Sequence, residues 1–220
     1  LTRSSAASDV YKRQSHNSAS DQKHNLLIGG ALLMITLLRS VAVITTPLEL
    51  GVDEAQYWLW SQTPDFGYYT KPPLIALIIG FAHWLFGHQT WAVRLPACWI
   101  HLITALLLWR GAAWLFGQQA GQLAALIWIS LPATGLGSFL MSTDTPLLAL
   151  WSAGLLAVCG IASGRLSSSV GMGLAGLAFG AAMLAKFAAM YALIGLMLAY
   201  LHGLMTQQKL FDWRGFGIAL

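Results

Sequence analysis

Residues 51–73 read GVDEAQYWLWSQTPDFGYYTKPP and separate two long apolar runs of the sequence. Three of the chain's 8 acidic residues lie in this stretch, together with one lysine: Asp53, Glu54, Asp65 and Lys71. Aromatic residues are interleaved with them, at Tyr57, Trp58, Trp60, Phe66, Tyr68 and Tyr69. Aromatic side chains favour the membrane–water interface, and carboxylates beside a bilayer are costly unless they face water or bind something. We therefore expect this loop to lie over a membrane surface and to carry the chemistry of the protein.

The composition is that of an integral membrane protein. Of the 220 residues, 57% are hydrophobic and 9% are charged, whereas soluble domains carry about 25% charged residues. The net charge of +4 comes mostly from Lys and Arg in short segments between apolar runs. Such segments act as topology signals, so no nucleic-acid partner is expected. Cys98 and Cys159 lie in apolar runs and are expected to pack there, and no His/Cys cluster has metal-ligand spacing.

The apolar runs predict an all-α, polytopic membrane helix bundle. About 20 apolar residues are needed to cross a hydrocarbon core about 30 Å thick. About six runs are expected to do so: 26–46, 91–116, 120–140, 145–162, 170–185 and 187–205. The run 74–87 is short for a span and ends in aromatic residues, so an interfacial or re-entrant helix is expected in the large first outer loop. Residues 1–23 are polar, Ser-rich and basic, and are expected to form a disordered, partly non-native tail.

The positions of Lys and Arg predict how these helices are oriented. If the N-terminus is cytoplasmic, a set of basic residues falls on cytoplasmic ends, as the positive-inside rule requires: Lys23, Arg110, Arg165, Lys209 and Arg214. The outer side then receives the loop 47–90 and the turns before 145 and 187. Charged residues gather there: Asp53, Glu54, Lys71, Arg94, Asp144 and Lys186. This clustering requires that 74–87 does not span the membrane.

The acidic residues each have two interpretations. Asp53 can act as a base toward a hydroxyl nucleophile, with Glu54 raising its pKa by like-charge repulsion or orienting an acceptor. Alternatively, Asp53 is a helix cap and Glu54 a first-turn acid. Asp144 is expected to cap a helix that has Pro146 in its first turn. That role leaves Asp144 free to face the same outer cavity.

Three basic residues are candidates for binding a phosphate. Lys71 precedes two prolines, which keep it out of a helix, and Arg94 lies at the outer mouth of a span, where a guanidinium can bind phosphate bidentately. Lys186 follows the glycine-rich run GLAGLAFG (173–180), whose small residues allow close helix packing. The alternative for Lys71 and Arg94 is anchoring in the lipid headgroups. Arg39, inside the first span, either snorkels or faces the bundle, or it contacts an anionic ligand.

Five motifs occur in an order that resembles a known family: DEAQYWLWSQ, GYYTKPPL, AVRLP, STDTPLL and GLAFGAAMLAKFAAMY. The sequence resembles bacterial polyprenyl-phosphate-sugar-dependent glycosyltransferases of the dolichyl-phosphate-mannose protein mannosyltransferase and aminoarabinose lipid A transferase type. The resemblance extends from about residue 26 to the end. It implies the family-C glycosyltransferase fold, with residues 24–220 forming the N-terminal part of a transmembrane domain. Family members normally continue with further spans and a soluble outer domain, so a fragment is expected here.

The resemblance also implies an activity and a set of roles. The donor is a polyprenyl-phosphate sugar, the acceptor is lipid A, another glycolipid or a protein, and transfer takes place at the outer face of a bacterial inner membrane. The expected catalytic residues are Asp53, Glu54 and Asp144, and the expected donor-phosphate ligands are Lys71, Arg94 and Lys186. Tyr57, Tyr68 and Tyr69 are expected to line the acceptor and donor site. No cofactor is indicated, and a divalent metal ion is left open.

The competing class is a membrane transporter or flippase for a lipid-linked or anionic substrate. Charged residues at helix ends and glycine-rich helices also suit a substrate pathway through a membrane. The sequence has no internal repeat, however, and its acids cluster in a loop instead of near the bilayer midplane. A glycosyltransferase is therefore the preferred interpretation.

Overall fold

The computed structural model describes the backbone of residues 2–206, with the side chains of residues 22–203 and 205. Within this range the protein is all-α, as predicted, and has no strand. Its elements are α1 (Thr2–Thr45), α2 (Val52–Gln62), α3 (Leu74–Phe86), α4 (Thr90–Phe116), α5 (Gln118–Ser130), α6 (Pro132–Gly137), α7 (Asp144–Ala162), α8 (Ser168–Met183), the 3₁₀ helix η1 (Phe187–Ala189) and α9 (Met190–Thr206).

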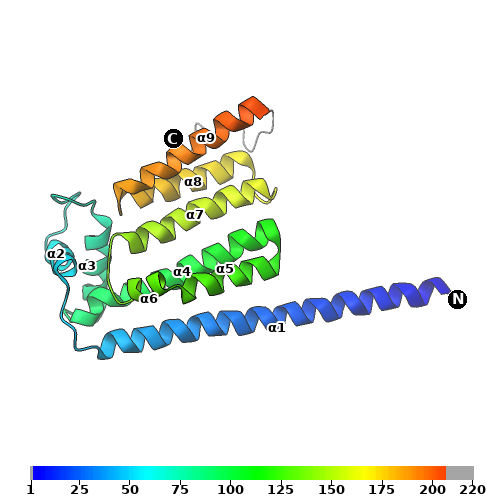
Figure 1. Ribbon diagram of the computed structural model, residues 1–220, viewed down its shortest axis with the longest axis horizontal. Coiled ribbons are helices and arrows are strands. Elements are labelled where there is room, and N and C mark those ends of the chain that lie inside the picture. Colours follow the sequence, from blue (N-terminus) through cyan, green and yellow to red (C-terminus); the bar gives the residue numbers. More distant parts are fainter. Residues whose placement is uncertain (1, 207–220) are drawn as a thin grey trace.

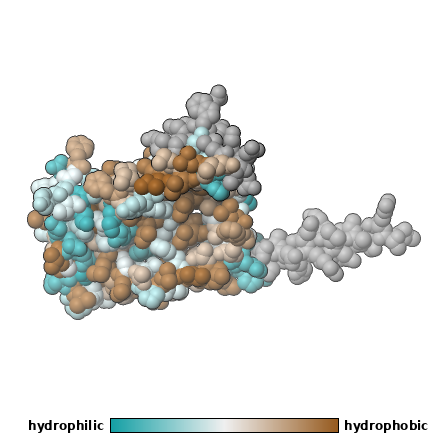
Figure 2. All heavy atoms as spheres, turned by 45° about the horizontal axis from the view of Figure 1, so that its top comes forward, coloured by the Kyte–Doolittle hydropathy of each residue, from teal (hydrophilic) through white to brown (hydrophobic). Residues whose placement is uncertain are grey.

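The long helices form a bundle that is covered at one end. Figure 1 shows α1, α4, α5, α7, α8 and α9 lying roughly side by side, with α2 and α3 across one end of the bundle. The turn between α6 and α7 and the segment between α8 and α9 reach the same end. Hydrophilic side chains gather at this end, whereas the body of the bundle is largely hydrophobic (Figure 2). We call it the polar end.

The chain is a membrane protein. Of the about six predicted spans, three coincide with helices that, among the described residues, are long and apolar enough to cross a membrane: Gln22–Thr45, Thr90–Phe116 and Asp144–Ala162. The predicted span 120–140 is interrupted, because α5 ends at Ser130 and α6 begins at Pro132. Proline pushes the preceding residue out of the helical region, and Leu131 is accordingly extended at φ −59° and ψ 134°. Shorter apolar helices over 168–183 and 187–203 complete the bundle.

Helix α3 has the position predicted for an interfacial element. It has 13 residues, lies at the polar end and ends at Gly87, which has a φ of 78°. Because α3 does not run through the bundle, α4 and α7 both begin at the polar end. Each later helix therefore runs through the bundle in the direction that the sequence predicted.

At the N-terminus, helix α1 begins at Thr2 and extends well beyond the bundle (Figure 1). The disordered, partly non-native tail predicted for residues 1–23 stays a prediction. Residues 2–25 contain no glycine or proline, so nothing in the sequence stops the helix of the first span from propagating backward. Lys209 and Arg214, which contributed to the predicted orientation, lie outside the described residues.

Two apolar clusters fix the elements of the polar end. One joins α2, α3 and α4 with the loop before α7, through Tyr57, Ile75, Ile79, Val93, Ala97 and Met141. The other joins α7, α8 and η1 through Leu147, Ala182, Ala185 and Ala189. The backbone N–H of Leu74 donates to the carbonyl of Leu184 at 2.9 Å, so the start of α3 is tied to the end of α8.

Close packing of α7 on α8 depends on Gly154 and Gly171, which lie outside the predicted run. A methyl group added at Gly154 would collide with the ring of Phe179, and one at Gly171 would collide with Ile161. Gly180, inside the glycine-rich run, faces open space. The close approach predicted at Gly180 is therefore wrong, because this residue lies on the exposed face of α8.

Candidate functional site

The polar end is organised by a buried ion pair. Arg94, in the first turns of α4, donates from Nη2 to Oε2 of Glu54 at 2.7 Å and from Nε to Oε1 at 2.9 Å. Both side chains are only 4% exposed. Glu54 also accepts from the backbone N–H groups of Gly51 and Met141, each at 3.0 Å. The carboxylate thus connects α2, α4 and the loop before α7.

Arg94 makes two further hydrogen bonds to the loop after α1. Its Nη1 donates to the carbonyl of Leu48 at 2.9 Å, and its Nη2 donates to the carbonyl of Glu49 at 2.7 Å. This geometry does not support the predicted contact of Arg94 to a donor phosphate, because its donors already face protein acceptors in a buried site. The sequence could not reveal these partners, since any residue supplies a backbone carbonyl.

Glu54 is held ionised by its surroundings. Burial alone would raise the pKa of the Glu54 carboxyl, but the hydrogen bonds from Arg94, Gly51 and Met141 and the charge of Arg94 outweigh burial, so the pKa lies below its ordinary value. The bond to Gly51 also closes a capping box, with Glu54 at the third position of α2. The carboxylate is buried and paired, so this arrangement does not support the predicted catalytic role of Glu54.

Asp53 has the opposite environment. It lies in the first turn of α2, is exposed, and makes no hydrogen bond or ion pair with any described residue. Gly51, not Asp53, is the cap of the helix, so the predicted capping role is wrong. Asp53 borders a cavity of about 360 Å³ between 51–54 and 140–142. Its carboxylate is therefore free to contact a molecule in that cavity.

The charges of Asp53 and Asp144 both act on the hydroxyl of Tyr57. Tyr57 is only 4% exposed and packs in the cluster of α2, α3 and α4. Burial raises the pKa of its hydroxyl, and the negative charges of Asp53 and Asp144 raise it further. The two acids are 91 positions apart in sequence, yet both lie near the same phenol ring, as the predicted clustering requires.

Asp144 pairs with Lys186. The Nζ of Lys186 donates to Oδ1 of Asp144 at 2.7 Å, with side chains 37% and 52% exposed. Asp144 is the first residue of α7 and makes no capping bond, so its predicted capping role is wrong, although Pro146 does lie in the first turn. Lys186 lies in extended backbone between α8 and η1. This exposed pair is open to an incoming anion, unlike the pair between Arg94 and Glu54.

Lys71 lies close in sequence to the contact between the start of α3 and the end of α8. Pro72 and Pro73 are buried, and the next residue, Leu74, is bonded to Leu184. The backbone carbonyl of Lys71 accepts from Tyr68 at 3.0 Å, while its ammonium group has no partner among the described side chains. Lys71 and Lys186 therefore flank the contact between the start of α3 and the end of α8.

The remaining tyrosines differ in their surroundings. The Tyr68 ring stacks on Trp60 with centroids 4.8 Å apart, and its hydroxyl donates to the carbonyl of Trp60 at 2.9 Å. These contacts fix the loop after α2 and do not support a role in contacting substrate. Tyr69 is 98% exposed.

Arg39 faces the bundle and donates to the carbonyl of Ile129 at 2.7 Å, which favours its structural interpretation.

Among the described residues, no group of three or more His, Cys, Asp or Glu side chains could hold a metal ion.

A family model described as dolichyl-phosphate-mannose-protein mannosyltransferase matches residues 70–216. The chain belongs to the dolichyl-phosphate-mannose-protein mannosyltransferase family. The match includes Lys71, Arg94, Asp144 and Lys186, whereas Asp53 and Glu54 precede it.

Two relatives of this chain carry the names of glycosyl-group transferases. The lipid A galacturonosyltransferase RgtD of Rhizobium johnstonii is 38% identical over 166 residues, which are 74% of this chain and 34% of that protein. The undecaprenyl phosphate-α-4-amino-4-deoxy-L-arabinose arabinosyl transferase 1 of Sodalis glossinidius is 32% identical over 143 residues, covering 56% of this chain and 25% of the relative. The chain thus spans about a third or less of the length of these relatives.

Solved structures support the same fold. The crystal structure of ArnT from Cupriavidus metallidurans in the apo state matches with a TM-score of 0.70 and 22% identity, over 86% of this chain and 38% of that one. The structure of the same ArnT bound to undecaprenyl phosphate also matches with a TM-score of 0.70, at 21% identity. The helix arrangement described for this member of the mannosyltransferase family is therefore that of the matching part of the ArnT structures.

Proposed function

We propose that this chain forms the donor-binding part of a membrane glycosyltransferase. The enzyme transfers a sugar from a polyprenyl-phosphate donor to lipid A or another envelope glycolipid, with a protein as the less favoured acceptor. Family membership supports the reaction class, and the names of two relatives support a lipid A acceptor and a lipid-linked donor. The same membership favours an enzyme over the transporter that the sequence left as an alternative.

The observation that carries the proposal is the unpaired carboxylate of Asp53 at the rim of a cavity. The acceptor hydroxyl gives its proton to Asp53, and the acceptor oxygen then bonds to the anomeric carbon of the donor sugar. The bond from that carbon to the phosphate oxygen breaks, and its electron pair leaves with the polyprenyl phosphate. Asp53 fits the role because it is exposed and unpaired, whereas Glu54 is buried and held ionised by Arg94.

Lys71 and Lys186 are the proposed ligands of the donor phosphate. They flank one junction between α3 and α8, and an ammonium near a leaving phosphate stabilises its developing charge. Asp144 holds Lys186 in place before the donor arrives. The proposed role of Arg94 is to hold the loop that carries Asp53, through Glu54 and the carbonyls of Leu48 and Glu49.

The proposed location of this site is the outer face of a bacterial inner membrane. Arg110 and Arg165 lie at the end of the bundle opposite the polar end (Figure 1). The positive-inside rule assigns that opposite end to the cytoplasm. The polar end, with Asp53, Lys71 and Lys186, then faces the periplasm.

The test is a transfer assay with the full-length protein in detergent. The donor is undecaprenyl phosphate carrying a radiolabelled sugar, and the acceptors offered are lipid A and a control phospholipid. The proposal predicts label in lipid A and release of undecaprenyl phosphate. In a second experiment the protein is reconstituted into proteoliposomes. Movement of the intact donor across their bilayer, without release of undecaprenyl phosphate, would instead identify a transporter.

A further inference from the structure

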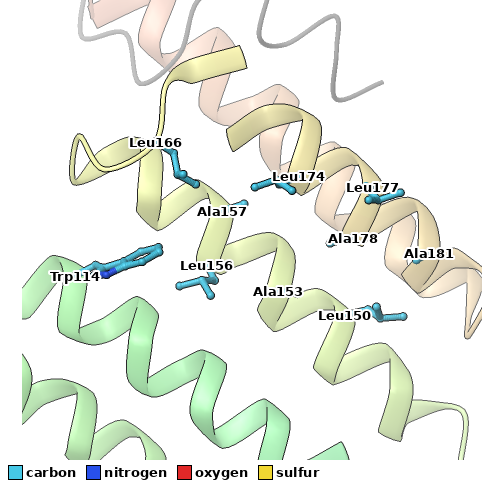
Figure 3. A pocket seen from close by; sticks show the side chains of 10 residues that line it. All are labelled: Trp114, Leu150, Ala153, Leu156, Ala157, Leu166, Leu174, Leu177, Ala178 and Ala181. Carbon is cyan, nitrogen blue, oxygen red and sulfur yellow. The ribbon is translucent and has the colours of Figure 1, made fainter. Parts of the chain in front are cut away.

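An apolar groove runs along the body of the bundle. It has a volume of about 440 Å³ and lies between α4, α7 and α8, and every residue that lines it is Trp, Leu or Ala. Figure 3 shows Trp114 and Leu166 at one end of the groove and Leu150 and Ala181 at the other. The volume falls within the range of about 300–1,000 Å³ that is typical of ligand sites. Such a groove on a membrane-embedded surface suits a hydrocarbon chain.

Two arginines mark the Trp114 end of this groove. The guanidinium carbon of Arg110 lies 5.2 Å from the centre of the Trp114 ring, and that of Arg165 lies 5.8 Å from it. Arg165 also donates to the Trp114 carbonyl at 3.2 Å. Both arginines are exposed. Their guanidinium groups therefore converge on one ring, beside the entrance to an apolar groove.

No described carboxylate neutralises these arginines. The acidic residues with described side chains all belong to the polar end: Glu49, Asp53, Glu54, Asp65 and Asp144. Arg110 is near the end of α4 and Arg165 follows α7, at the opposite end of the bundle. Paired guanidinium groups bind phosphate bidentately, and basic pockets between spans on the cytoplasmic side bind anionic lipid headgroups.

We propose that this groove binds an anionic glycerophospholipid. The phosphate contacts Arg110 and Arg165, and one acyl chain lies in the groove between α7 and α8. The headgroup is assigned to this end because both arginines lack a carboxylate partner among the described side chains, whereas Lys186 at the polar end is paired with Asp144. The proposed headgroup contacts lie at the end of the bundle opposite Lys71 and Lys186, and the bound lipid fills a groove that side chains leave open.

The experiment is native mass spectrometry of the full-length protein in detergent, titrated with phosphatidylglycerol or with phosphatidylcholine of the same acyl chains. We expect one phosphatidylglycerol to bind more tightly than phosphatidylcholine. The double variant Arg110→Gln/Arg165→Gln should lower the affinity for phosphatidylglycerol by about tenfold or more, to the level of phosphatidylcholine. A second variant, Ala153→Leu, fills the groove and should weaken both lipids. Its matched control, Ala162→Leu, adds the same bulk at an exposed position of α7 outside the groove and should weaken neither.

Four results would overturn the proposal. Unchanged phosphatidylglycerol affinity in the double arginine variant would remove the headgroup contact. Binding that survives Ala153→Leu would mean that no acyl chain occupies the groove. No preference for phosphatidylglycerol in the wild-type protein would mean that the arginines do not select an anionic headgroup. Displacement of phosphatidylglycerol by undecaprenyl phosphate, with the loss of that displacement in Lys186→Gln, would assign the groove to the donor chain.

Discussion

The Glu54 carboxylate and the Arg94 guanidinium form two short hydrogen bonds, of 2.7 Å and 2.9 Å, at a site where each side chain is 4% exposed. This pair connects the loop after α1, the start of α2, the start of α4 and the loop before α7. The neighbouring Asp53 is thereby presented at the surface with no partner among the described residues. Glu54 therefore holds the structure together, and Asp53 is the acid proposed to act in the reaction.

Breaking the buried pair should destabilise the protein strongly. Arg94→Met leaves the Glu54 charge buried without its partner, and we expect the free energy of unfolding to fall by about 3–5 kcal/mol. The double variant Arg94→Met/Glu54→Leu should recover much of this loss, because it removes both charges. Thermal unfolding of the full-length protein in detergent measures the effect.

The exposed pair provides the matched control for that experiment. Lys186→Met removes a partner of Asp144 that is 37% exposed, and we expect a change below about 1 kcal/mol. Equal losses in Arg94→Met and Lys186→Met would contradict the assignment of the structural role to Arg94.

The stability of the protein should depend on pH through Glu54. Its folded-state pKa lies below the ordinary value of 4.5, so the folded state favours the ionised form. This contribution is fully present above about pH 4.5 and is lost as the pH falls through the lower, folded-state pKa. The melting temperature of the wild-type protein should therefore fall more steeply below pH 4.5 than that of Glu54→Gln. Parallel melting curves for the two proteins would show that Glu54 does not set this dependence.

The two lysines at the junction of α3 and α8 should affect donor use without affecting stability. We expect Lys71→Gln and Lys186→Gln each to raise the KM for the polyprenyl-phosphate donor by about ten- to a hundredfold, because a charge-assisted contact contributes about 1.5–3 kcal/mol. Lys23→Gln is the control, since Lys23 is exposed on α1 far from this junction. Donor kinetics that are equal in all three variants would assign Lys71 and Lys186 to anchoring.

Glycines in the contact between α7 and α8 should tolerate a methyl group unequally. Gly154→Ala forces a methyl group into the Phe179 ring, and we expect a loss of about 1–3 kcal/mol. Gly180→Ala places the same group in open space and should be neutral or slightly stabilising, because alanine favours helices. Melting temperatures of the two variants give the comparison, and similar losses in both would contradict the packing described here.

The sequence predicted most of the fold and the grouping of charges. Runs of apolar residues and the short run 74–87 were enough to predict the helix bundle and the end at which Asp53, Lys71, Asp144 and Lys186 meet. The family resemblance is confirmed by the match over 70–216. These features depend on length, hydropathy and charge sign, which are properties of the sequence itself.

The pairing of the charges could not be predicted from the sequence. Arg94 and Lys186 are both basic residues at helix ends, and only their three-dimensional surroundings distinguish a buried arginine from an exposed lysine. The break at Pro132 was also missed, because a proline in an apolar run is compatible with either a kinked helix or the end of a helix.

The central claim is that Asp53 is the base, and Asp53→Asn in the full-length enzyme tests it most directly. Asparagine keeps the size of the side chain and removes its basicity, so at saturating donor and acceptor we expect kcat to fall by about 10²–10⁴. Because Asp53 is exposed and unpaired within the described structure, the melting temperature should stay nearly unchanged. Glu49→Gln, which neutralises an exposed carboxylate just before α2, should keep wild-type turnover. A near-wild-type kcat in Asp53→Asn would contradict the account and make Asp144 the next candidate.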